Sequence, residues 1–205
     1  GPDQTIRTSG GQLTNIHQIV ILVNGDTASA AEVMTLALKQ QRDDVTIVGT
    51  TTYGKGTVQV TRTFSDGSAI KYTTAKWVSP DGTWVNGVGI TPDETVRLHD
   101  ALYNAYAGME DDESYSFDSV ADAVKDMQLC LDYLGYAPDR QDGYFSEASK
   151  EALSRFESDH ALTADGVLNK TAYEALISAV RMDWGTTSNH DTQLQKAQEI
   201  LHDGK

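Results

Sequence analysis

The first hundred residues alternate short apolar runs with polar turns. Residues 18–24 (QIVILVN) are almost all apolar and β-branched, which predicts a strand buried on both faces. Apolar side chains then recur at helical spacing from Ser29 to Gln40, in a stretch rich in strong helix formers. A second β-branched run at 45–49 predicts another strand. The pattern is therefore strand, helix and strand.

The next stretch has the two-residue period of strands. Residues 57–64 and 68–78 alternate in this way around Ser65-Asp66-Gly67, a sequence typical of a hairpin turn. A strand–helix–strand unit followed by antiparallel hairpins indicates an α/β core with a mixed sheet.

The second half has a helical pattern and an internal repeat. DGYFSEASKEAL at 142–153 and DGVLNKTAYEAL at 165–176 align without gaps, and Asp-Gly predicts a turn before each helix. Upstream, one helical face carries apolar residues at Val120, Val124, Met127, Leu131 and Leu134. We expect a small all-α module of three helices, with Cys130 packed in its core.

The distribution of charge indicates a domain boundary, and the net charge argues against nucleic acid as a partner. The chain has 16 basic and 30 acidic residues, a net charge of −14, and such a surface repels nucleic acid. Residues 101–205 hold 20 acidic and 8 basic residues, and the change begins near the acidic run 110–113. We expect a core domain at 1–109, an acidic linker at 110–117, a helical domain at 118–182, and a linker with a terminal helix at 183–205. Gly1-Pro2 is typical of the remnant of a cleaved expression tag.

Ser29 opens the predicted helix directly after a strand. Its hydroxyl would lie where free N–H groups and the positive end of the helix dipole converge, which suits a nucleophile whose attack creates an oxyanion. A structural interpretation also fits, because Ser29 and Glu32 have the S-x-x-E spacing of a capping box. The local pattern alone favours capping.

Lys55 lies between two glycines in GTTTYGKG, which nearly matches the phosphate-binding pattern G-x-x-x-x-G-K-[ST]. Gly56 stands where that pattern needs Ser or Thr, and the residues that follow have the period of a strand instead of the required helix. The pattern therefore argues against a nucleotide site. The five histidines show no metal-ligand spacing, and we expect neither a metal nor a cofactor.

Three segments within residues 18–96, VILVNGDTASAAEV, IVGTTTYGKGTVQ and SDGSAIKYTTAKWVSPDGTWVNGVGITPD, together resemble the carboxyl-terminal processing proteases, serine peptidase family S41. Their turn, G-K-G loop, S-D-G-S hairpin and G-[IV]-x-P-D exit follow the family's order. The resemblance implies a serine endopeptidase that cleaves protein or peptide substrates. It also implies an extracytoplasmic bacterial protein, secreted or membrane-anchored.

The resemblance further implies a Ser–Lys pair, with Ser29 as nucleophile, Lys55 as general base and Gln59 positioning the lysine. The backbone N–H of Ala30 would stabilise the oxyanion. Lysine amines are protonated at neutral pH unless burial disfavours the charge, so we expect a closed, dry site around Lys55. A neutral amide suits position 59, because a carboxylate there would keep the lysine protonated.

Family members also carry an upstream PDZ domain and a D-x-R-x-N-x-G-G-like strand end that supplies a second oxyanion donor. Residues 1–17 contain neither, apart from Gly10-Gly11. We therefore expect the 205 residues alone to lack a complete catalytic site and to be inactive.

Residues 118–182 resemble the peptidoglycan-binding domain type 1, with Glu157 where glutamine is usual. This resemblance implies a three-helix bundle that docks on cell-wall glycopeptide. A module of this kind can also serve as a scaffold or interaction domain without a glycan ligand.

The terminal segment DTQLQKAQEILHDGK places Leu194, Ala197, Ile200 and Leu201 on one helical face and resembles the segment that closes many S41 proteases. We expect this helix to pack on the protease core or on a second subunit, and the second arrangement would form a homodimer.

Two alternatives stay open. A Ser–His–Asp triad could use His17 or His99, because triad members need not be neighbours in sequence. The chain could instead be a non-catalytic cell-wall or partner-binding protein built on a remnant protease fold.

Overall fold

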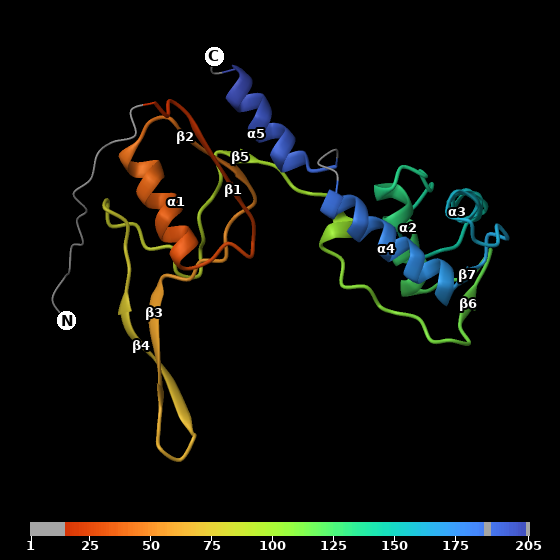
Figure 1. Cartoon of the computed structure of the whole chain (residues 1–205), viewed down its shortest axis with the longest axis horizontal. Coiled ribbons are helices and arrows are strands. Elements are labelled where there is room, and N and C mark those ends of the chain that lie inside the picture. The colour runs from red at the N-terminus through yellow and green to blue at the C-terminus, as the bar shows by residue number, and fades with distance from the viewer. Residues whose placement is uncertain (1–14, 187–189, 204–205) are drawn as a thin grey trace. The chain divides into compact units, whose positions relative to one another are not determined.

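The computed structural model describes residues 15–186 and 190–203, and the chain divides into two compact units, each with its own apolar core (Figure 1). The first unit comprises residues 1–97 and 192–205, and the second comprises residues 98–191. The expectations for Gly1-Pro2 and Gly10-Gly11 lie outside the described residues.

The first unit contains a parallel sheet of three strands in the order β1-β2-β5. Strands β1 (Ile19–Val23) and β2 (Val45–Gly49) are joined by helix α1 (Ala30–Gln41), and β5 is Glu94–Thr95. Both predicted strands and the predicted helix are present. The core beside this sheet is small: Val23, Ile47, Val85 and Ile90.

The prediction that the first strand is buried on both faces is wrong. Val23 is buried, but the neighbouring Leu22 is 40% exposed. Burial on both faces requires packed elements on each side of the sheet, and the exposed fraction of Leu22 shows that its side of β1 is only partly covered among the described residues.

The antiparallel hairpin forms a sheet of its own. Strand β3 (Thr57–Thr63) pairs with β4 (Ala69–Lys76), and Figure 1 shows this ribbon extending away from α1 and the parallel strands. The register shifts between Val58 and Gln59, a β-bulge that adds one residue to β4. Gly67 closes the turn at a φ of 84°, a conformation that glycine adopts without strain.

Helix α5 (Thr192–Asp203) packs on β1 and β2 of the first unit. The amide of Gln18 donates to the carbonyl of Ile200 at 3.1 Å, and that of Gln193 donates to Val96 at 2.9 Å. The hydroxyl of Thr192 donates to the carbonyl of Arg97 at 3.1 Å, so the two residues that border the second unit in sequence are hydrogen-bonded neighbours. Packing on a second subunit stays a prediction.

The second unit is built from helices α2 (Asp122–Tyr133), α3 (Glu147–Asp159) and α4 (Lys170–Thr186). A 3₁₀ turn at Asp100–Leu102 and a short strand pair, β6 (Ser114–Tyr115) with β7 (Leu168–Asn169), complete it. The largest buried side chains of its core are Phe145, Phe156, Met127, Leu131, Leu153, Leu168 and Leu176.

Residues 98–117 belong to this second unit. Ala101 and Met109 are part of its core, although the composition placed the boundary at the acidic run 110–113. Cys130 is buried there too, and burial raises the pKa of its thiol to about 12.

The α/β core with an antiparallel hairpin, followed by a helical module, is therefore confirmed. Its parallel and antiparallel strands lie in two separate sheets. No helix in the described part of the chain combines the length and apolarity needed to cross a membrane.

The sequence repeat has a structural counterpart in which one side chain differs. At the first Asp-Gly turn, the buried amide of Gln128 on the preceding helix accepts from the N–H of Gly143 at 3.0 Å and donates to the carbonyl of Tyr144 at 2.7 Å. At the second Asp-Gly turn, buried Glu157 on the preceding helix accepts from the N–H of Gly166 at 2.9 Å. An ionised carboxylate cannot donate as the amide does, and burial raises the pKa of Glu157.

We predict that Glu157→Gln stabilises the second unit at neutral pH by about 1 kcal/mol, because the amide supplies a donor and removes a buried charge. Folding raises the pKa of Glu157, so the protonated side chain stabilises the folded state fully at a pH below its pKa in the unfolded chain. This contribution to stability is lost as the pH rises through the pKa of Glu157 in the folded chain. Hydrogen-exchange protection of α3, measured from pH 4 to 8, should lose that pH dependence in the variant. The exposed Glu174→Gln is the control, and equal protection in both variants would contradict the prediction.

Candidate active site

Ser29 lies at a strained turn between β1 and α1. Its φ and ψ are 57° and −115°, a left-handed backbone conformation that is unfavourable for any residue other than glycine. Ala30 is the first residue of α1, so its N–H is one of the donors left unpaired by the helix. The turn therefore holds a half-buried hydroxyl beside the positive end of a helix.

Lys55 lies in a loop whose shape depends on its two glycines. Gly54 has a φ of 83°, and a side chain there would meet the backbone N of Gly89 at 2.7 Å. At Gly56, an added Cβ would lie 2.5 Å from the indole nitrogen of Trp84. Strand β3 follows this loop, which agrees with the sequence argument against a nucleotide site. The glycines let neighbouring segments pack closely against the loop.

Two tryptophans hold the carbonyls of the same loop. The indole N–H of Trp77 donates to the carbonyl of Lys55 at 2.8 Å, and that of Trp84 donates to Gly56 at 2.9 Å. Both indoles thereby fix the backbone from which the lysine side chain extends.

Glu32 connects the serine turn to the lysine loop. Its fully buried carboxylate accepts from the N–H of Ser29 at 2.8 Å, from the hydroxyl of Thr52 at 2.5 Å, and from the N–H groups of Gly54 and Lys55 at 2.8 Å each. Burial alone would raise its pKa, but the bonds from Thr52, the loop and Ser29 outweigh it, and the pKa of Glu32 is lowered. One ionised carboxylate thus fixes both backbones.

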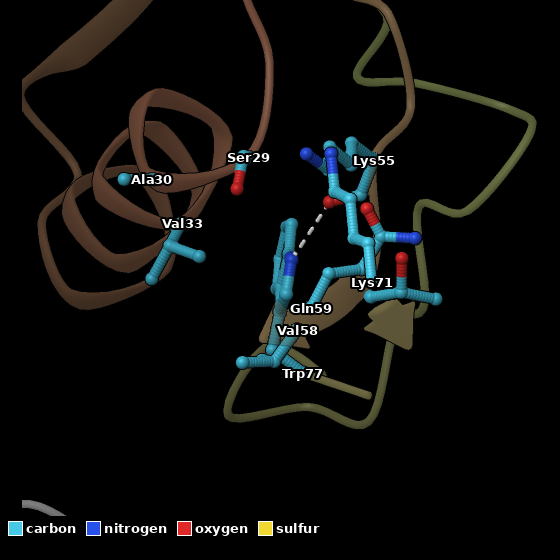
Figure 2. Close-up of a pocket in the computed structure, with 9 residues that line it drawn as sticks. Ser29, Ala30, Val33, Lys55, Val58, Gln59, Lys71 and Trp77 are labelled. Atoms are coloured by element: carbon cyan, nitrogen blue, oxygen red, sulfur yellow. Dashed lines mark hydrogen bonds between the residues drawn. The ribbon is translucent and has the colours of Figure 1, made fainter. Parts of the chain in front are cut away.

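A pocket of about 450 Å³ brings the predicted residues together (Figure 2). Ser29 and Ala30 come from the start of α1, Lys55 from the loop and Gln59 from β3. The full lining is Ser29, Ala30, Val33, Lys55, Thr57, Val58, Gln59, Lys71 and Trp77. All four sequence-predicted site residues therefore share one pocket.

The surroundings of Lys55 differ from the expected closed, dry site. Lys55 is half-buried and Gln59 is exposed, so the described residues do not enclose the lysine. Within the same described ranges, no carboxylate forms an ion pair with Lys55. The lysine is thus not held by an acid, and its amine faces the pocket.

The histidines of the alternative triad do not line this pocket. His99 belongs to the second unit, where its Nε2 lies 3.0 Å from the carboxylate of Asp132 and its Nδ1 accepts from the N–H of Ala101 at 3.1 Å. Both ring nitrogens of His99 therefore interact with other groups of the second unit.

The sequences of both units match known families. Residues 3–96 match Peptidase family S41, and residues 120–176 match the Putative peptidoglycan binding domain. The segment at residues 3–96 belongs to peptidase family S41.

Curated relatives of this chain carry protease names. A probable CtpA-like serine protease of Staphylococcus haemolyticus is 37% identical over 157 residues, which cover 77% of this chain and 31% of the relative. The carboxy-terminal processing protease CtpA of Bacillus subtilis is 34% identical over 182 residues, 89% of this chain and 38% of the relative. The chain thus spans about a third of the length of the curated relatives it matches.

A solved structure named photosystem II D1 C-terminal processing protease is 40% identical to the matched part of this chain. Its TM-score is 0.36, and the match covers 39% of this chain and 20% of the other.

Sequence reasoning missed three features of this site: the second role of Glu32, the indole of Trp77 and the side chain of Lys71. The capping-box spacing identified Glu32 as a partner of Ser29, but its bonds to Gly54 and Lys55 span more than 20 residues. For Lys71, the alternation of the hairpin could have indicated the face it shares with Gln59.

We predict that Glu32→Gln destabilises the first unit by about 2–3 kcal/mol at pH 7, because an amide cannot accept from all four donors. Folding lowers the pKa of Glu32, so its carboxylate stabilises the folded state at a pH above 4.5, the pKa of this group in the unfolded chain. This contribution to stability is lost as the pH falls through the pKa of Glu32 in the folded chain. The variant should therefore lack that acid-dependent loss of stability.

Denaturant titrations followed by tryptophan fluorescence measure this effect. In a Trp184→Phe background, the remaining tryptophans, Trp77 and Trp84, both report on the first unit. The exposed Glu94→Gln serves as the matched control, and equal stability of the two variants would refute the prediction.

Proposed function

We propose that this chain carries the nucleophile and the general base of a serine endopeptidase of the carboxyl-terminal processing type. The observation that carries the proposal is the Glu32 carboxylate, which ties the strained Ser29 turn to the Lys55 loop at the edge of one pocket. The match of residues 3–96 to peptidase family S41 and the names of the relatives support a protease.

In the proposed reaction, the amine of Lys55 takes the proton of the Ser29 hydroxyl as the oxygen attacks the substrate carbonyl. Negative charge develops on the carbonyl oxygen, and the N–H of Ala30 at the start of α1 stabilises it. The lysine then gives its proton to the leaving amine, and water hydrolyses the acyl-enzyme. Gln59 orients the lysine amine without adding a charge.

The substrate class and the location follow from the same family evidence. We infer that the substrate is a protein cleaved near its carboxyl terminus, because the relatives are named carboxy-terminal processing proteases. We also infer an extracytoplasmic location in a bacterium, because the second unit matches a peptidoglycan-binding family.

Activity assays on the natural full-length protein test the dyad. Ser29→Ala and Lys55→Ala should each lower kcat for an unfolded protein substrate by at least about 10²–10⁴-fold, since each removes a group that reacts or transfers a proton. Gln59→Glu should also lower kcat strongly, because a carboxylate would keep the lysine protonated. His17→Ala and His99→Ala serve as controls and should keep activity. Loss of activity in a histidine variant but not in Lys55→Ala would overturn the dyad.

A binding assay tests the second unit. We predict that the chain co-sediments with insoluble peptidoglycan and that residues 98–191 carry this binding. The unit is acidic, so we expect hydrogen bonds and apolar contacts to dominate and the binding to persist from low to high salt. Binding that disappears in moderate salt, or none at all, would contradict this part of the proposal.

A further inference from the structure

The pocket that holds Ser29 contains a second lysine with no role in the proposed reaction. Lys71 lines it together with Lys55, and none of the nine lining residues is acidic. Among the described residues, no carboxylate forms an ion pair with Lys71 either. The start of α1 adds the positive end of a helix dipole. The pocket therefore attracts anions, although the chain as a whole carries a charge of −14.

The strand register places Lys71 on the same face of the hairpin as Gln59. Gln59 pairs with Thr73, and Thr61 pairs with Lys71, so Lys71 is the diagonal neighbour of Gln59. Figure 2 shows both lysine side chains extending into the pocket. Lys71 lies on β4, directly opposite Thr61, and Thr61 is two residues beyond Gln59 along β3.

The two lysines differ in their surroundings. Lys55 is half-buried beside the serine turn, whereas Lys71 is exposed on a strand. A solvated ammonium is suited to attracting a negative charge and poorly suited to taking a proton. Apolar atoms of Val33, Val58 and Trp77 line the rest of the pocket and could contact the uncharged part of a peptide.

Resting on the proposed function, we propose that Lys71 binds a carboxylate of the substrate and thereby determines specificity. An extended peptide advances about 3.3 Å per residue, so the strand step from Gln59 to the level of Lys71 corresponds to about two substrate residues. The carboxylate can be the substrate's own carboxyl terminus or an Asp or Glu side chain, and both offer the same chemistry to an ammonium. Lys71 acts on substrate affinity, and the reaction at Ser29 does not use it.

The test measures peptide affinity in a Ser29→Ala background of the natural full-length protein, so it does not depend on turnover. The probes are short fluorescein-labelled alanine–valine peptides with a free carboxyl end, with an amidated end, or with an amidated end and one internal Asp or Asn. We expect the preferred carboxylate form to bind about threefold to fivefold more tightly than its uncharged partner, because exposed ion pairs contribute up to about 1 kcal/mol, and we expect high salt to reduce this difference. The form that gains affinity identifies the source of the carboxylate.

Substitutions at position 71 assign the effect to one side chain. Lys71→Gln should remove the preference for the carboxylate form, and Lys71→Arg should retain it because the charge is kept. Arg62→Gln is the matched control: it removes a cation from an exposed position on the opposite face of the same hairpin, outside the pocket lining. We expect this variant to retain the preference.

The inference fails if carboxylate and uncharged peptides bind equally, if Lys71→Gln weakens all forms alike, or if Arg62→Gln abolishes the preference. A second outcome also contradicts the inference: Lys71→Gln leaves peptide binding unchanged in the Ser29→Ala background but shifts the pH profile of hydrolysis in the protein that keeps Ser29. Lys71 would then act on Lys55 and not on the substrate. Failure of the proposed function appears separately, as hydrolysis that persists in Ser29→Ala.

Discussion

The buried carboxylate of Glu32 is the constraint on which the rest of the first unit depends. A charge taken out of water must be surrounded by donors, and Glu32 finds four of them in two segments that are distant in sequence. Satisfying one side chain therefore fixes the distance between the backbone of Ser29 and that of Lys55. The two interpretations of the S-x-x-E spacing, helix cap and catalytic turn, are consequently compatible, because the glutamate belongs to both.

The local features of this chain could be predicted from sequence, because they depend on neighbouring residues. Strands β2, β3 and β4, helix α1 and the Asp-Gly repeats follow from the periodicity of their own side chains and from turn residues. Ser29, Lys55 and Gln59 were identified because their spacing within short motifs matches a known family. The three residues line one pocket, and their catalytic roles stay a prediction.

Features that depend on distant contacts could not be predicted. The acidic run suggested a boundary at residue 110, but the burial of Met109 by the helical core places the preceding segment in the second unit. Leu22 is apolar and yet exposed, and the apolar run of its own strand does not specify which segments cover that face of the sheet. The dry environment expected for Lys55 would need groups from other segments, and no periodicity within its own loop specifies them.

The hydrogen bond between Thr192 and Arg97 has a consequence for how the two units can evolve. The chain leaves the first unit and re-enters it at adjacent points, so the helical unit is an insertion between Arg97 and Thr192. A short connection would be enough to join these two residues if the insertion were removed. Such an insertion can be exchanged for another domain, or deleted, while β1, β2 and α5 keep their mutual packing. The fold of the first unit can thus acquire a different inserted module without any change to the pocket that holds Ser29 and Lys55.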